Sequence, residues 1–202
     1  MSPATAVLIA LLVPSAATTD ATFGRLEGDL GLVVGAGAAL GPRGARATGD
    51  FRLRLLDSAG WFAGYEDSAG TSVDPIRVLY TGMELRPLFL ARWLTGLEFG
   101  QRFADLCVDS LGLEIGAFAA QPTGGALGDR SGLQVGLGLE VPLAARAVGP
   151  WLAFHGGARL TEPALARGET SSVERALYLS ITLAWHAMFA ARIVDKGDAA
   201  PQ

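Results

Sequence analysis

A chain of 202 residues is long enough for one domain with a full core and too short for two ordinary domains. Hydrophobic residues make up 50% of the sequence, charged residues only 18%, and the formal net charge is −4. This balance offers no basic surface to nucleic acid, and the single cysteine, Cys107, excludes an internal disulfide and a cysteine-based metal cluster.

The first 17 residues have the pattern of an export signal. An apolar run over residues 6–13 is broken by Pro14, and Ser15 and Ala17 place small residues at positions −3 and −1 of a cleavage site after Ala17. The segment ahead of the run contains no Lys or Arg, so a buried first strand or helix is the alternative. We expect a signal peptide at residues 1–17, followed by export.

From residue 23 to residue 189, apolar residues recur at every second position. Because successive side chains of a strand point to opposite faces, this period predicts strands with one apolar face. Eight segments follow the rule, over residues 26–40, 48–55, 79–86, 97–102, 111–117, 132–141, 152–160 and 177–186.

Three features indicate that the apolar faces point outward into a membrane. Several segments run about 9–13 residues, near the length that a tilted strand needs to cross hydrocarbon. The opposite faces combine glycines with charges of both signs, which suits a narrow polar interior. Aromatic residues stand at segment ends, as in the interface girdles of membrane barrels; they are Phe23, Trp93, Phe103, Trp151, Trp185 and Phe189.

This pattern resembles the small eight-stranded barrels of bacterial outer membranes, of the OmpA-transmembrane and OmpX type. The resemblance covers about residues 23–189 and implies an all-β fold: a closed antiparallel up-and-down transmembrane β-barrel. It also implies the outer membrane of a Gram-negative bacterium, contact with lipid and lipopolysaccharide, and insertion by the barrel assembly machinery. Residues 190–202 would form a C-terminal tail, and we expect a monomer.

The strand count depends on the connection over residues 57–75. This segment is long for a turn and contains Trp61-Phe62-Ala63-Gly64-Tyr65, which could form a strand of its own. Since bacterial single-chain barrels have an even number of strands, its pairing would raise the count from eight to ten.

The inward faces predict a charge network inside the barrel. An eight-stranded barrel is just wide enough for side chains to fill it, so charges of opposite sign should pair there and close it. The expected members are Glu27, Asp29, Asp50, Arg52, Arg54, Glu84, Arg86, Glu98, Arg102, Glu114, Glu140, His155 and Arg159. The residues expected to face lipid are Leu53, Leu97, Leu113, Val135, Leu137, Leu139, Phe154, Leu179, Ile181 and Leu183.

Two alternative functions stay open beside a structural, adhesive or small-solute role. A soluble periplasmic barrel that binds an apolar ligand would turn Leu133, Val135, Leu137 and Leu139 toward a cavity. A lipid A-modifying enzyme would need an activated nucleophile, but Ser180 and His186 lie roughly 20 Å apart along one strand. His155 of the neighbouring segment could approach Ser180 instead.

We expect no enzymatic activity, cofactor or metal site. Two histidines without cysteine pairs make a zinc site improbable. The pair Asp105 and Asp109 could bind calcium in a loop, but solvated loop acids are the commoner case. The glycines between residues 35 and 41 lack the spacing of a dinucleotide-binding motif.

Overall fold

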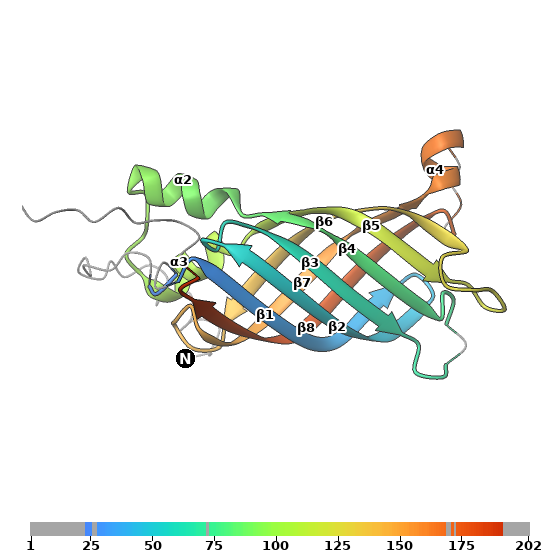
Figure 1. The fold of residues 1–202 in the computed structure, drawn as a ribbon, viewed down its shortest axis with the longest axis horizontal. Coiled ribbons are helices and arrows are strands. Elements are labelled where there is room, and N and C mark those ends of the chain that lie inside the picture. Colours follow the sequence, from blue (N-terminus) through green and yellow to red (C-terminus); the bar gives the residue numbers. More distant parts are fainter. Residues whose placement is uncertain (1–22, 26–27, 72, 169–170, 172, 192–202) are drawn as a thin grey trace, which may run out of the picture.

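A computed structural model describes residues 23–25, 28–71, 73–168, 171 and 173–191. The expected signal peptide, Glu27 and most of the expected tail lie outside the described residues. Eight strands form a closed antiparallel barrel in which each strand pairs with its neighbours in sequence and the last pairs with the first (Figure 1). The predicted fold class, an eight-stranded up-and-down barrel, is confirmed.

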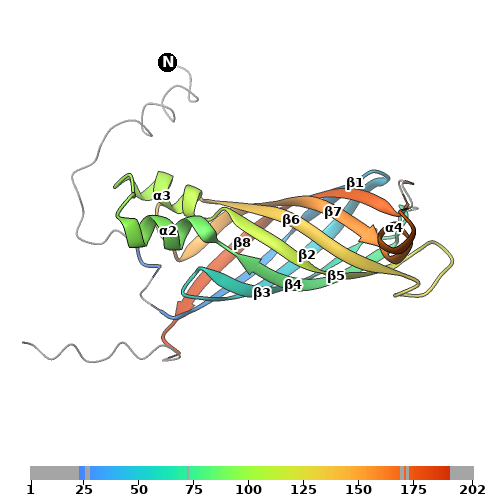
Figure 2. The same ribbon diagram turned by 90° about the horizontal axis from the view of Figure 1, so that it is seen from above.

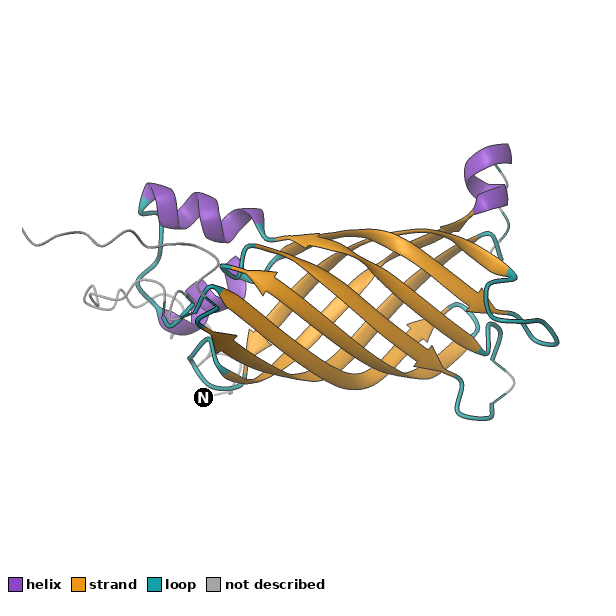
Figure 3. Ribbon diagram, viewed as in Figure 1, coloured by secondary structure: helices purple, strands orange, loops and turns teal. Residues whose placement is uncertain are grey.

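The strands account for most of the described chain (Figure 3). Their bounds are β1 Leu30–Gly41, β2 Gly44–Leu55, β3 Ala59–Asp67, β4 Arg77–Leu85, β5 Gly112–Gln121, β6 Arg130–Pro142, β7 Gly149–Thr161 and β8 Arg175–Phe189. Three helices lie in the connections: α2 Pro87–Thr95, α3 Arg102–Asp109 and α4 Glu162–Arg167.

The count of eight agrees with the prediction, but the set of segments differs. Residues 59–67 form β3, which pairs with β2 and β4. Its sequence keeps the period of two, with Trp61 and Tyr65 exposed and Phe62 and Glu66 buried. The possible extra strand is therefore real, yet the barrel does not grow to ten strands because another predicted strand is absent.

The prediction of a strand over residues 97–102 was wrong. Pro87 occupies the first turn of α2, where a missing N–H does no harm. Gly96 then ends the helix in the left-handed conformation, at φ 65°, and its N–H bonds back into the last turn. Gly100 is also left-handed, at φ 73°, so residues 97–101 connect two helices.

The barrel has two unlike ends. At the terminus end lie both described ends of the chain, the turn over residues 56–58, the loop over residues 143–148 and the pair α2–α3 (Figures 1 and 2). At the opposite end, here called the mouth end, lie the β1–β2 turn, the loops over residues 68–76 and 122–129, and α4. In both views α2 continues from β4 roughly parallel to the barrel axis.

A small core closes the terminus end. Phe23, Leu106, Ala147 and Trp151 form a buried apolar cluster there. Beside it Asp109 accepts hydrogen bonds from Arg25 and Arg92, each at 2.7 Å. Arg92 also pairs with Asp105, so the charges that α2 and α3 bury have partners.

Candidate functional site

Most of the barrel interior is one network of arginines and carboxylates. Arg52 Nη1 donates to Glu84 Oε2 and to Glu114 Oε1, both at 2.6 Å. Arg54 pairs with Glu84 and reaches across the barrel to Glu140, with Nη2 2.6 Å from Oε1. These side chains come from β2, β4, β5 and β6, so the network joins different parts of the wall.

The network of arginines and carboxylates extends to the terminus end of the barrel. Arg86 follows β4 directly, pairs with Glu140 and donates from Nη1 to Asp57 Oδ1 at 3.0 Å. Each of these side chains is less than a tenth exposed. Because an unpaired buried charge is expensive, loss of one partner from such a pair destabilises a protein by about 3–5 kcal/mol.

Both histidines belong to this network. His155 Nδ1 lies 2.8 Å from Glu114 Oε1. His186 stacks on Trp151 with ring centroids 4.5 Å apart, and its Nε2 lies 3.4 Å from Glu140 Oε2. Both imidazoles are buried, but only His155 is hydrogen-bonded to its carboxylate; His186 Nε2 lies near Glu140 without a hydrogen bond.

Ser180 does not form a nucleophile–base pair. It is the register partner of His155, but its hydroxyl donates to the His155 backbone carbonyl at 3.4 Å. Ser180 is 5% exposed and faces the interior, so an acyl chain outside the barrel cannot reach it. His155 and Ser180 are thus neighbours in the sheet, but the His155 imidazole does not make the contact with the Ser180 hydroxyl that activation of a nucleophile requires.

Eight of the expected network residues face the barrel interior, and they lie on the strands in the expected parity. They are Asp50, Arg52, Arg54, Glu84, Glu114, Glu140, His155 and Arg159, all buried. Arg86 lies just beyond β4. Asp29 is buried ahead of β1, where it accepts the Ala191 N–H at 2.5 Å. Glu27 is not among the described residues.

Glu98 and Arg102 were expected in the interior, and this expectation was wrong. Both lie in the helical connection that replaces the predicted strand. Glu98 is half-buried there, and burial, together with nearby Asp105 and Asp109, raises its pKa. Arg102 is exposed and lies over the ring of Phe23 at 5.7 Å.

Several interior residues escaped the sequence analysis. Arg46 has the same parity as Arg52 and could have been found by extending the second segment. Glu66 needed the recognition of β3. The residues of the terminus end, Arg25, Asp57 and Arg92, come from connections, where no period marks an inward position.

The outer face of the barrel is apolar. Leu137 is 55% exposed, and the other outward positions are Leu53, Leu113, Leu139, Leu179, Ile181 and Leu183. Val135 and Phe154 point the same way and are half-buried. Leu97, expected on a strand, is 68% exposed in the α2–α3 connection. Leu133, Val135, Leu137 and Leu139 therefore point away from the interior, which is opposite to the orientation that a soluble ligand-binding barrel requires.

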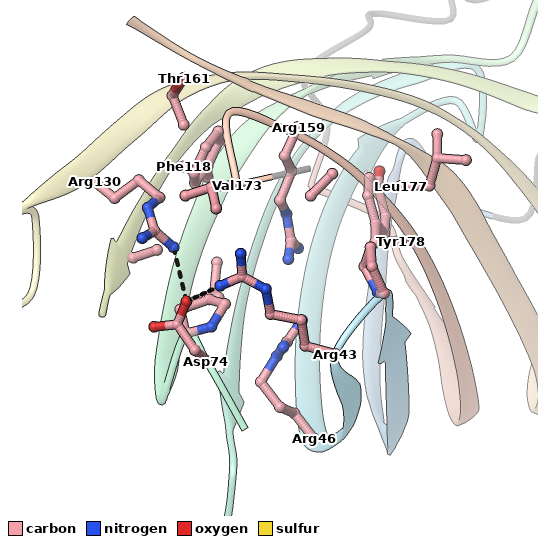
Figure 4. A pocket seen from close by; sticks show the side chains of 15 residues that line it. Arg43, Arg46, Asp74, Phe118, Arg130, Arg159, Thr161, Val173, Leu177 and Tyr178 are labelled. Atoms are coloured by element: carbon pink, nitrogen blue, oxygen red, sulfur yellow. Dashed lines mark hydrogen bonds and ion pairs between the residues drawn. The ribbon is translucent and has the colours of Figure 1, made fainter. Parts of the chain in front are cut away.

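A pocket opens at the mouth end (Figure 4). At its base Glu66 accepts hydrogen bonds from Arg46 Nε at 2.8 Å and from Arg159 Nη2 at 2.6 Å. Arg159 lies over the ring of Tyr178 at 4.5 Å. Tyr80, Phe62 and Phe118 belong to the aromatic layer between this pair of arginines and the network below.

The rim of the pocket is held by Asp74. Its carboxylate pairs with Arg43 and with Arg130 Nη1 at 3.3 Å, and it accepts the Thr123 N–H at 3.0 Å. Partial burial opposes ionisation of Asp74, but the Thr123 N–H and the two arginines outweigh it and hold its pKa below the ordinary value. Three segments of the mouth end meet at this carboxylate.

The described part of the chain holds neither a metal-binding cluster nor a membrane-spanning helix. No group of three or more His, Cys, Asp or Glu side chains is arranged to hold a metal ion there. None of the described helices has the length and apolar character needed to span a membrane.

The fold and its interior define a closed eight-stranded barrel filled by ion pairs. No protein-family model and no curated protein matches this sequence. Among solved structures, the chain is similar to Ail, the attachment invasion locus protein of Yersinia pestis, in complex with the heparin analogue sucrose octasulfate. The identity is 9% and the TM-score 0.36, over 78% of this chain and 97% of Ail.

Proposed function

We propose that this chain is an integral β-barrel of the Gram-negative outer membrane, with a closed interior and a structural or adhesive role. The observation that carries the proposal is the inverted distribution of side chains. Charged residues are buried inside the barrel, and large apolar residues cover its outside. In water this outer face would be a far larger apolar patch than soluble monomers expose, whereas in lipid it is the favourable surface.

The closed sheet supports the same environment. β8 pairs with β1 over eleven residues of β1, so the seam leaves no free strand edge along that length. Lipid offers no hydrogen bonds to backbone groups, and a closed barrel satisfies them all within the sheet.

The α2–α3 connection fits beside the lipid-facing strands. On α2, Phe89 and Arg92 are buried, Arg92 against Asp105 and Asp109 of α3, while Leu94 is 74% exposed on the opposite side. The outward side of α2 carries no charged residue. We therefore include α2 in the surface that contacts the periplasmic leaflet, with both chain ends in the periplasm and the mouth end outside the cell.

The interior supports a structural or adhesive role more than passage of solutes. Its arginines and carboxylates pair across the interior, and these ion pairs, which join β2 to β4, β5 and β6, fill the space between the walls. An adhesive role would use the mouth end, where the longer loops and α4 lie.

Carbonate extraction of cell envelopes tests the membrane assignment. We expect the full-length chain, expressed with its own leader in a Gram-negative host, to stay in the pellet and to dissolve only in detergent. A soluble periplasmic protein in the same cells is the control. Release of the chain by carbonate or salt alone would contradict the proposal.

Absence of enzymatic activity on lipid A is part of the proposal, because the buried Ser180 lacks an imidazole partner. Mass spectra of lipid A from cells with and without the protein should be identical. A shift of one acyl chain upon overexpression would contradict this part alone.

A further inference from the structure

The charges of the barrel interior are not balanced layer by layer. Below the aromatic layer, carboxylates outnumber arginines: Asp50, Asp57, Glu84, Glu114 and Glu140 face Arg25, Arg52, Arg54 and Arg86. In the mouth pocket the order is reversed. Four arginines line it, Arg43, Arg46, Arg130 and Arg159, and only two carboxylates, Glu66 and Asp74, pair with them. The pocket therefore carries two positive charges in excess.

Arg46 is the focus of this excess. It is 5% exposed, and only its Nε has a hydrogen-bond acceptor among the described residues, the Glu66 carboxylate that Arg159 also uses. Its two terminal nitrogens have none. Figure 4 shows Arg43, Arg46 and Arg159 gathered around the same space. Like charges placed together repel one another, and an anion bound between them would relieve that repulsion.

The ring of Tyr178 also lines the pocket, but its hydroxyl points into the network below, next to Gly136, the register partner of Glu114. The Tyr178 hydroxyl is buried and has no hydrogen-bond partner in the described structure. Further acids at the mouth end, such as Glu174, which accepts the Thr161 hydroxyl, do not line the pocket. The donors of the pocket that the described residues leave unused are therefore those of Arg46.

The rim of the barrel is lower beside this pocket. Residues 175–178 of β8 pair with β7, but the register of β8 with β1 ends at Leu40 and Leu179. The short β1–β2 turn therefore leaves a notch in the wall next to Ala176 and Leu177. Leu177 is 71% exposed, and with Val78, Phe118 and Val173 it gives the pocket apolar walls.

We propose that the mouth pocket binds a phosphate monoester that carries an apolar substituent. A phosphate dianion matches the excess of two positive charges, and guanidinium groups bind its oxygens in a fork geometry. The notch admits the substituent along Leu177. The same chemistry is found in a lipid phosphate of the outer leaflet and in a small soluble alkyl phosphate.

Titration calorimetry on the detergent-solubilised full chain tests the site with two probes, butyl phosphate and inorganic phosphate, at fixed ionic strength. We expect saturable 1:1 binding of butyl phosphate, at least about threefold tighter than inorganic phosphate because methylene groups leave water. Arg46→Gln should weaken both probes at least about tenfold, since a charge-assisted contact is lost. Leu177→Asp should weaken butyl phosphate more than inorganic phosphate.

Arg77→Gln is the matched control. Arg77 is an exposed arginine at the same end that pairs with Asp67 and does not line the pocket, so its loss should leave both affinities unchanged. If Arg46→Gln fails to fold, Arg43→Gln at the exposed rim replaces it, with the same expected direction. Absence of saturable binding, or equal weakening by Arg77→Gln and the pocket variants, would overturn the inference.

Nanodiscs separate the two sources of the ligand. If the natural ligand is a lipid, phosphatidic acid in the disc should compete and lower the apparent affinity for butyl phosphate relative to phosphatidylcholine discs. Equal affinity in both discs assigns the site to a soluble phosphate. Either result leaves the membrane proposal untouched, because carbonate extraction tests that proposal without any ligand.

Discussion

Parity along the strand decides the environment of each side chain. On β2, Leu53 is exposed on the outer face, whereas its neighbours Arg52 and Arg54 are 2% and 1% exposed inside. A change of one position along the chain thus exchanges an apolar surround for an ionic one. Wherever a strand was recognised, the sequence therefore showed which of its residues face the interior and which face outward.

Leu137→Arg tests the outer face at a single position. Leu137 is 55% exposed on β6, and an arginine on the lipid face of a barrel destabilises it by about 2–4 kcal/mol near the bilayer midplane. Urea unfolding from lipid vesicles measures this difference. The control is Leu127→Arg in the loop over residues 122–129, which should have little effect; equal stability of the two variants would contradict the orientation of β6.

Cys107 provides a pH test at the terminus end. Burial raises the pKa of this α3 thiol to about 11, and nearby Arg25 offsets the effect only in part. Since the thiolate is the reactive form and a free cysteine has a pKa near 8.5, alkylation at about pH 8 should be at least about a hundredfold slower in the folded protein than in urea. Alkylation at comparable rates in both states would show that the packing of α3 at the terminus end does not bury Cys107.

The sequence did not predict which arginine pairs with which carboxylate. Arg54 and Glu140 are 86 positions apart, and their contact depends on how far each strand is shifted against the next. The two-residue period of a strand shows which face of the sheet a residue lies on. It does not show how far along the barrel axis the residue lies. Parity predicted the interior location of Glu114, for example, but not its choice of Arg52 and His155.

At the scale of elements, β3 and α2 mark where local patterns were ambiguous. The segment 97–102 alternates like a strand, but the preceding Pro87 and the closing Gly96 favour a helix that ends just before it. β3 has the same alternation with fewer aliphatic residues, because its outward positions are Trp61, Ala63 and Tyr65. Residues 59–67 become a strand because they pair with β2 and β4 in the sheet.

Glycines on inward positions allow close approach of β4 and β5. Gly82 and Gly116 are register partners, and a Cβ on Gly82 would lie 2.2 Å from the Ile115 carbonyl oxygen and 2.8 Å from the Phe62 ring. We expect Gly82→Ala to destabilise the barrel by about 1–3 kcal/mol through overpacking.

Gly49→Ala is the matched control in the same sheet. Gly49 is outward-facing, and the nearest atom to an added Cβ is the Gly35 carbonyl oxygen at 3.7 Å, an ordinary contact. The stability of the Gly49→Ala variant should equal or slightly exceed that of the unaltered protein. Urea unfolding of both variants makes the comparison, and equal losses at the two positions would contradict the packing argument.

For the whole molecule, the closed interior predicts the absence of steady ion conductance. Four strands contribute to the network of Arg52, Arg54, Glu84, Glu114 and Glu140, and α2 and α3 lie at the terminus end. Planar lipid bilayers that contain the purified protein should show no stable single-channel steps, with a known porin as the control. Regular steps that grow with protein concentration would contradict the filled interior.

The architecture as a whole was the most predictable level. Alternation over most of the chain suffices for an eight-stranded barrel, because lipid and ion pairs impose opposite demands on the two faces. The cap at the terminus end and the pocket at the mouth end were not predictable, since they come from connections without a repeating pattern.

The contact between Arg54 on β2 and Glu140 on β6 has a mechanical consequence. A ring of eight strands bound only to neighbours could flatten into an ellipse with little loss of sheet pairing. Ion pairs that span the interior act as cross-braces, because flattening would stretch some of them and crush others. The barrel should therefore keep a round cross-section under lateral pressure and hold its mouth at a fixed shape.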